Sequence, residues 1–196
     1  EIGWLPKVLE ILREELEKTE LIIHSSSSPE LMQALLHGKM DVAFLRPDNT
    51  VQELAFRPLT EEVLFVLMPA DHRLAKRKAI RVDEIRGETF INFSTKYSPE
   101  LRRVIDDYLM RSGINITPAH EVETLPMVIS LALSTGGVTF LPAYMTRLLP
   151  PSVVGRPLLG KAPTITLALG YSKNNLSALL KRFLLKADDL IAGAVI

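Results

Sequence analysis

Histidine and cysteine are the residue types to examine first, because their spacing decides whether metal or thiol chemistry is available to this chain. The four histidines are His24, His37, His72 and His120, and no two of them have a metal-ligand spacing such as H-x-x-x-H. The chain has no cysteine, which excludes disulfides, thiolate nucleophiles, zinc ribbons and iron–sulfur clusters. We therefore expect no metal and no cofactor.

Catalytic serine and phosphate-binding motifs are also missing from the sequence. No G-x-S-x-G elbow is present, and the glycine-rich segment 134–138 (STGGV) matches neither a Walker loop nor a dinucleotide fingerprint. The pair Asp71 and His72 resembles half of an acid–base pair, although we favour a surface turn capped by the aspartate. The sequence thus predicts that the protein is not an enzyme.

Helix starts carry the positive signal. Ser28-Pro29-Glu30 and Ser98-Pro99-Glu100 each combine a hydroxyl cap, an early proline and a first-turn acid, and Thr124 with Pro126 is a looser third case. In an open parallel sheet such helix N-termini face the ligand side and suit a carboxylate or phosphate. The alternative, that these residues are only caps, stays open.

The predicted pocket is polar without charge and has apolar neighbours. Residues Ser25 to Ser28 form a hydroxyl-rich run, and Phe93 and Phe140 are either pocket walls or core residues. This combination indicates a pocket for a small organic acid with an apolar body.

Charge and composition limit the classes of partner. The 196 residues carry 23 Lys and Arg against 23 Asp and Glu, so this segment does not bind nucleic acid by bulk charge. Its most basic stretch, Arg73 to Val82, lacks aromatic residues for stacking and is interpreted as a solvated loop. No membrane span or signal peptide is apparent, and we expect a cytoplasmic protein. The start at Glu1 rather than Met suggests a piece of a longer chain.

Hydrophobic periodicity predicts an α/β protein with a mostly parallel sheet covered by helices. Residues 150–163 hold four prolines and two glycines and are expected to be an extended connector. Helices are expected near 4–17, 28–38, 98–113, 124–136 and 176–187, and strands at 21–23, 42–45, 63–68, 90–93, 120–122, 138–141 and 164–171.

Four strings in order along the chain resemble one family. They are Leu5–Leu9 (LPKVL), Gly38–Arg46 (GKMDVAFLR), Pro69–Ala75 (PADHRLA) and Gly136–Pro142 (GGVTFLP). The last departs from the usual pattern by one place in its first glycine. Over nearly its whole length the chain resembles the effector-binding (regulatory) domain of LysR-type transcriptional regulators.

The resemblance implies a type II periplasmic-binding-protein-like fold, with two lobes of mixed, mostly parallel sheet flanked by helices and joined by two crossover strands. Lobe I would comprise residues 1–70 and 167–196, and lobe II residues 71–166, with crossings near 67–73 and 164–168. An N-terminal winged helix-turn-helix, a linker helix and a first strand would precede residue 1.

Family binding positions map onto particular residues of this chain. The implied effector contacts are Ser27, Ser28, Asn92, Phe93, Ser94, Thr124, Leu125 and Pro142. Implied candidates for a dimer interface are Trp4, Ile11 and Met127, with core packing as the alternative for Trp4 and Ile11.

The resemblance implies a sensor of a small molecule. The expected ligand is a small or aromatic carboxylate, which would bind in the cleft between the lobes. Promoter DNA would be bound through the missing N-terminal domain of a homodimer or homotetramer, with no membrane partner. A transport-linked solute-binding protein of the same fold is the alternative, since fold alone does not separate the two functions.

Overall fold

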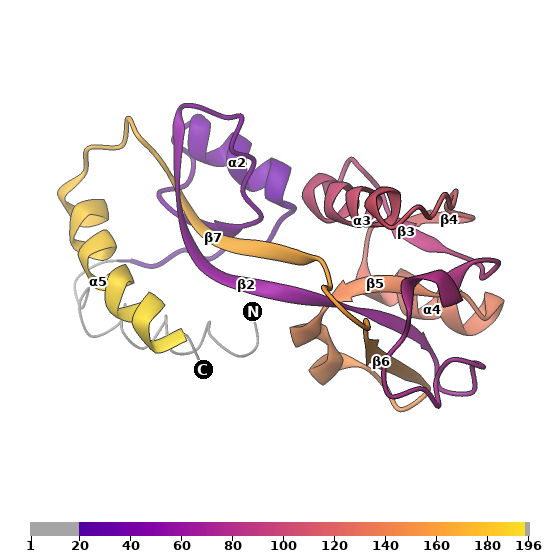
Figure 1. The fold of residues 1–196 in the computed structure, drawn as a ribbon. Coiled ribbons are helices and arrows are strands. Elements are labelled where there is room, and N and C mark those ends of the chain that lie inside the picture. Colours follow the sequence, from indigo (N-terminus) through magenta and orange to yellow (C-terminus); the bar gives the residue numbers. More distant parts are fainter. Residues whose placement is uncertain (1–19, 195–196) are drawn as a thin grey trace. The chain divides into compact units, whose positions relative to one another are not determined.

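The computed structural model describes residues 20–194, of which 187–194 are described by their backbone alone. It divides into two compact units (Figure 1). Unit 1 takes the chain up to Thr60 and again from Ala168, and unit 2 is the continuous stretch Glu61–Leu167. The chain passes from one unit to the other within β2 (Leu54–Pro69) and again within β7 (Thr164–Ser172). The apolar end of β2 belongs to the core of unit 2.

Within residues 20–194, unit 1 contains two helices and a small antiparallel ladder. Strand β1 (Ala43–Leu45) pairs with β7, with Phe44 opposite Leu169. Helix α2 (Ser28–Leu36) packs its buried leucines against β1 and the start of β2. Helix α5 (Ala178–Ala194) packs against β7 through Leu180, Phe183 and Leu184. Burial of these apolar faces holds the short elements in place.

Unit 2 is built on the second half of β2, which pairs antiparallel with both β5 (Thr139–Pro142) and β6 (Val153–Pro157). Strands β3 (Ile91–Phe93) and β4 (His120–Val122) form a parallel pair, and a parallel bridge between Phe90 and Val138 connects β3 to β5. The remaining elements are α3 (Pro99–Arg111), α4 (Leu125–Thr135) and the 3₁₀ turns Val82–Ile85 and Ala143–Leu148.

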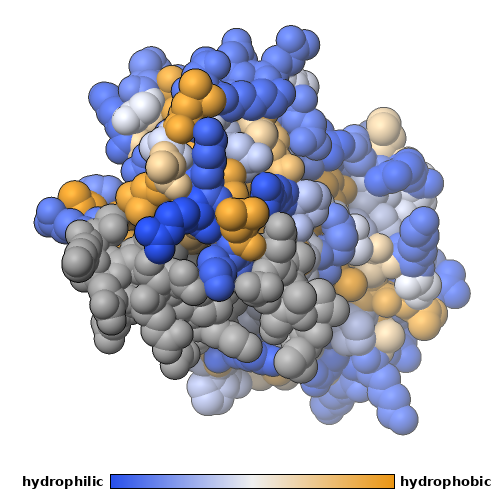
Figure 2. Space-filling view, turned by 90° about the vertical axis from the view of Figure 1, so that its left-hand side faces the viewer, coloured by the Kyte–Doolittle hydropathy of each residue, from blue (hydrophilic) through white to orange (hydrophobic). Residues whose placement is uncertain are grey.

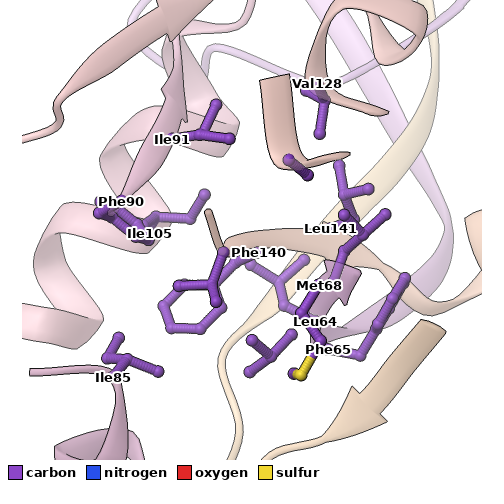
Figure 3. Packing of buried hydrophobic residues seen from close by; sticks show 14 of the residues in the cluster. Leu64, Phe65, Met68, Ile85, Phe90, Ile91, Ile105, Val128, Phe140 and Leu141 are labelled. Carbon is purple, nitrogen blue, oxygen red and sulfur yellow. The ribbon is translucent and has the colours of Figure 1, made fainter. Parts of the chain in front are cut away.

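The core of unit 2 lies around the apolar run 64–68 of β2 and the ring of Phe140 (Figure 3). Phe140 makes edge-to-face contacts with Phe90 and Tyr108, at centroid distances of 5.8 and 6.1 Å. Each large apolar side chain buried in this way contributes about 1.5–3 kcal/mol. This packing fixes the strands whose ends carry the predicted site.

Local sequence explains the two helices of unit 2. In α3, Pro99 starts the helix, and Leu101, Ile105 and Leu109 recur at four-residue spacing to form its buried stripe. In α4, Thr124 caps the first turn, and Gly136 ends the helix in the left-handed conformation, with φ of 68°. Helix α3 follows β3 after the turn 94–98, and α4 follows β4 after residues 123 and 124.

The α/β class is confirmed, while the sheets are more mixed than expected. The ladders β1–β7, β2–β5 and β2–β6 are antiparallel, and β3–β4 is parallel. The physical reason is that β2 and β7 run back across the sheets, so β2 pairs antiparallel with β5 and β6, and β7 with β1. The predicted connector 150–163 is extended as expected, but its central part is the strand β6, which pairs with β2.

The predicted strand at 21–23 is wrong. Leu21, Ile22 and Ile23 have no regular secondary structure and are 43%, 71% and 57% exposed. A strand is stabilised by a ladder partner, and none is paired with these residues within 20–194. The predicted helix at 4–17, with Trp4 and Ile11, lies outside the described residues.

On the face shown in Figure 2, hydrophilic residues predominate, and hydrophobic residues lie in scattered groups among them. Across the described part of the chain, the helices are all too short or too polar to cross a bilayer.

One buried hydroxyl generates a prediction about stability. Thr139 of β5 is fully buried, and its Oγ1 has no hydrogen-bond partner. Thr139→Val keeps the shape and removes the unpaired oxygen, so we expect the free energy of unfolding to rise by about 1 kcal/mol. Urea unfolding followed by circular dichroism measures this change. Thr166→Val is the control, because the Thr166 hydroxyl binds the Glu61 carboxylate. A loss of stability in Thr139→Val would contradict the assignment.

Candidate ligand-binding site

The carboxyl ends of three strands face the same edge of unit 2. Strands β3 and β4 are parallel, and the Phe90–Val138 bridge sets β5 parallel to β3. Ser94 follows β3, Thr124 follows β4, and Pro142 ends β5. The Ser94 amide donates to the Val122 carbonyl at 2.8 Å, which connects the ends of β3 and β4 directly. Ligands of α/β proteins bind beyond such strand ends, and the structure brings the three predicted residues to this edge.

The loop after β3 is a tight turn held by its own backbone. The Ser94 carbonyl accepts from the amides of Tyr97 and Ser98 at 3.2 and 3.0 Å, and Ser94 Oγ accepts from the Lys96 amide at 3.2 Å. Ser98 stands at the N-cap of α3, but its hydroxyl makes no capping bond. The half-buried Ser94 hydroxyl and the Ser98 hydroxyl thus lie where β3 leads into α3.

Asn92 and Phe93 lie inside unit 2. Asn92 is fully buried, donates from Nδ2 to Asp106 Oδ1 at 3.1 Å, and accepts from the Phe93 amide at 2.9 Å. Phe93 is 4% exposed and belongs to the core. The Asn92 side chain is hydrogen-bonded within the protein, and the Phe93 side chain is packed in the core. Of the three residues 92–94, only Ser94 is therefore accessible to a ligand.

Thr124 and Leu125 begin α4. The Thr124 hydroxyl accepts from the Met127 amide at 3.4 Å, which confirms its role as the N-cap. Leu125 is half-buried against the core, and Met127 is 52% exposed. Met127 therefore faces solvent in this chain, whereas Leu125 supports the helix start.

In unit 1, the cap of α2 is Ser27, and not Ser28 as the sequence suggested. Ser27 Oγ accepts from the Glu30 amide at 3.4 Å, and Glu30 Oε2 accepts from the Ser27 amide at 3.1 Å, which completes a capping box. The Ser26 and Ser27 hydroxyls also donate to the same carboxylate oxygen. The Glu30 carboxylate thus accepts hydrogen bonds from the Ser26 and Ser27 hydroxyls and from the Ser27 amide.

Ser28 is the hydroxyl of this run that remains oriented toward the adjoining strand. Its Oγ accepts from the amide of Arg46, the residue after β1, at 3.0 Å. Within residues 20–194, the Ser28 hydroxyl donates no hydrogen bond. The half-buried Ser28 therefore keeps one donor for a ligand.

His72 binds a distant glutamate rather than its neighbour Asp71. Its Nε2 lies 3.1 Å from Glu88 Oε2, and its Nδ1 accepts from the Leu74 amide at 3.2 Å. Its side chain is 8% exposed, while Asp71 is exposed. The backbone turn of the preferred interpretation is present, since the His72 amide donates to the Pro69 carbonyl, but the side chain that accepts from a turn amide is His72 rather than Asp71. The sequence did not reveal Glu88 as the partner of His72.

The basic stretch 73–82 pairs with acids of the same region. Arg73 bonds Glu88, Arg77 lies 3.4 Å from Glu84, and Arg81 bonds Asp83. The hydrogen bond from Arg81 lowers the pKa of Asp83 below its ordinary value. Much of the positive charge is thereby compensated, as expected of a solvated loop. In the described residues, no group of three or more His, Cys, Asp or Glu residues could hold a metal ion.

Unit 2 brings Ser94, Thr124 and Pro142 to one edge of its strand ends, and unit 1 has the half-buried Ser28 hydroxyl at the start of α2. Strand ends of this kind are typical of α/β domains that bind small molecules. The family described as "LysR substrate binding domain" matches residues 2–187. The chain belongs to this family, as the resemblance indicated.

Curated relatives of similar sequence are named as transcriptional regulators. The Hca operon transcriptional activator HcaR of Escherichia coli K12 is 26% identical over 98% of this chain and 65% of its own length. The regulator AlsR of Bacillus subtilis 168 is 22% identical over 92% of this chain and 60% of its own length. The chain therefore spans less than two thirds of these relatives.

Solved structures confirm the fold. The effector-binding domain of BenM with benzoate has a TM-score of 0.82 at 17% identity, covering 97% of this chain and 87% of that one. The effector-binding domain of QuiR with shikimate has a TM-score of 0.82 at 19% identity, covering 96% and 88%. The type II periplasmic-binding-protein-like fold class is thus confirmed.

The two serine caps predict different effects on stability. Ser27→Ala removes a capping-box hydroxyl and should lower the free energy of unfolding by about 1 kcal/mol. Ser98→Ala removes a hydroxyl that caps nothing and should change it by less than about 0.5 kcal/mol. Chemical unfolding of both variants checks this difference, and equal losses would contradict the assigned caps.

Proposed function

We propose that this chain is the effector-sensing domain of a LysR-type regulator, and that its ligand is a small or aromatic carboxylate bound at the strand ends of unit 2. The observation that carries the proposal is the shared edge of unit 2, where the ends of β3, β4 and β5 bring Ser94, Thr124 and Pro142 together. The family resemblance adds Ser28 of unit 1, whose Oγ accepts from the Arg46 amide. Relatives named as transcriptional regulators over nearly the whole chain support sensing rather than transport.

The ligand class follows from the donors that these residues offer. Hydroxyl and helix N-terminal N–H groups bind a carboxylate oxygen without a cationic side chain. Benzoate and shikimate, the ligands of the two structural relatives, are both ring carboxylates. Asn92 and Phe93 stay in the proposed site as the residues that position Ser94, and Leu125 as support for the start of α4.

Regulation would run from the ligand to promoter DNA through segments outside this chain. The greater length of the curated relatives leaves room for a DNA-binding domain. Ligand binding would shift the population between arrangements of the lobes and so re-space the DNA-binding domains of a homodimer or homotetramer in the cytoplasm. The exposed Met127 of α4 is the described residue that we propose for the contact between copies; Trp4 and Ile11 are proposed from the family resemblance alone.

A thermal-shift screen tests the ligand class. Benzoate and shikimate, with their amides as matched neutral controls, are added to the 196-residue chain. A ligand that binds the folded state at about a hundredfold above its Kd stabilises it by about 2.7 kcal/mol, which raises Tm by several degrees. We expect a rise with an acid and none with its amide. Equal shifts, or none across a wider panel of small carboxylates, would contradict a carboxylate site.

Ser28 is tested against a matched serine of the same unit. Ser28→Ala should weaken carboxylate binding about tenfold, since a hydrogen bond to a charged group contributes about 1.5 kcal/mol or more. Ser177→Ala is the control, because its hydroxyl also accepts one backbone amide, that of Leu180 at 3.1 Å. Titration calorimetry with the acid found in the screen gives both affinities. Equal affinities for the two variants would remove Ser28 from the site.

A further inference from the structure

Arg102 of α3 connects the ends of the two parallel strands of unit 2. Its guanidinium donates to Asp106 Oδ2 at 2.6 Å, to Glu121 Oε1 of β4 at 2.7 Å, and to the Phe93 carbonyl at the end of β3 at 3.3 Å. The side chain is only 15% exposed, although both acids reach solvent. One side chain thereby joins α3, β3 and β4 at the edge of the proposed site.

The same cluster holds the other backbone polar group of Phe93. Asp106 accepts from Arg102 on one carboxylate oxygen and from Asn92 Nδ2 on the other, at 3.1 Å. The Asn92 side-chain oxygen in turn accepts from the Phe93 amide at 2.9 Å. Both the amide and the carbonyl of Phe93, the residue directly before Ser94, are therefore fixed by one chain of hydrogen bonds.

Electrostatics favours a permanently charged group in this place. Burial alone would lower the pKa of Arg102, but hydrogen bonds to Glu121 and Asp106 outweigh it and raise the pKa above its ordinary value. A planar guanidinium can serve three acceptors in fixed directions, which a lysine ammonium on a flexible stem does not reproduce. We call the four residues Arg102, Asp106, Glu121 and Asn92 the Arg102 cluster. Its hydrogen bonds hold the Phe93 backbone in one orientation.

We infer that Arg102 is a positioning residue for ligand binding, which acts by holding the turn 94–98 in the conformation that presents Ser94. The inference deepens the proposed function and rests on it. Asn92 then has a role that is compatible with its burial. Its side chain connects Asp106 to the Phe93 amide and so helps to hold the backbone directly before Ser94. Arg102 itself does not contact the ligand.

Its neighbour Arg103 provides a matched control. Arg103 also bonds two acids of α3, Glu100 and Asp107, at distances of 2.6–2.9 Å. Its side chain is 60% exposed, and its bonds stay within the helix. Arg103→Met therefore removes the same charge and a similar number of ion pairs from the same helix without touching the strand ends.

The experiment compares Arg102→Met, Arg102→Lys and Arg103→Met in the 196-residue chain. Amide hydrogen exchange over residues 93–98, without ligand, should become several-fold faster in both Arg102 variants and stay at the wild-type rate in Arg103→Met. If the competent turn conformation falls to about a tenth of molecules, the Kd for benzoate or shikimate rises about tenfold. Arg102→Lys should not restore either quantity.

Each outcome decides the inference. Unchanged exchange in both Arg102 variants overturns it, and so does faster exchange with unchanged affinity for the acid that binds the wild type. Equal changes in exchange rate and Kd in Arg103→Met would show that Arg102 acts only through the general stability of α3. This result would also overturn the inference. If the wild type binds neither acid, the proposed carboxylate class fails separately, and hydrogen exchange still decides whether Arg102 holds the turn.

Discussion

The apolar run 64–68 of β2 is the constraint on which unit 2 depends. Its backbone is paired with β5 on one side and β6 on the other, and its side chains are buried among those of Phe90, Phe140 and Ile105. A strand that is paired on both edges and buried on both faces has its register fixed by packing, because a slip by one residue would exchange the side chains that fill the space on each face. The position of β5, and through it of β3 and β4, follows from that register. The geometry of the proposed site is therefore a consequence of core packing.

Polar groups near the proposed site are mostly engaged with one another. The first turn of α2 is satisfied by Glu30, Thr124 caps α4, and Asn92 is bound to Asp106. Such internal satisfaction keeps buried polar atoms from destabilising the fold and leaves a small number of directed donors for a ligand. In the proposed site, recognition through a few hydroxyl and amide groups would select a ligand by its shape and hydrogen-bond geometry more than by its net charge.

Local signals in the sequence predicted the elements well, and long-range partners much less well. The three-to-four spacing of leucines in α3, the cap at Thr124 and the apolar runs of β2 and β5 are properties of neighbouring residues, so they could be predicted. The strand ends of the site also followed from the family resemblance. The burial of Asn92 and the Glu88 partner of His72 depend on residues more than ten positions away, which no local pattern encodes. An i, i+4 pairing of Arg102 with Asp106 could have been suspected, but not its bonds to the strand ends.

The division of the chain has a consequence for the order of folding. Unit 2 is one continuous stretch, whereas unit 1 is assembled from two segments that flank it, and the β1–β7 ladder joins residues more than a hundred positions apart. Closing a flexible loop of that length is entropically costly, and pairings of such high contact order form slowly. Once unit 2 has folded, residues 61–167 no longer form a flexible loop between β1 and β7. The effective loop that the β1–β7 pairing must close is then short. Synthesis from the N-terminus adds a delay, because β1 must wait for β7 to emerge, and a nascent chain holds the first half of unit 1 without its partner strand until β7 has been synthesised.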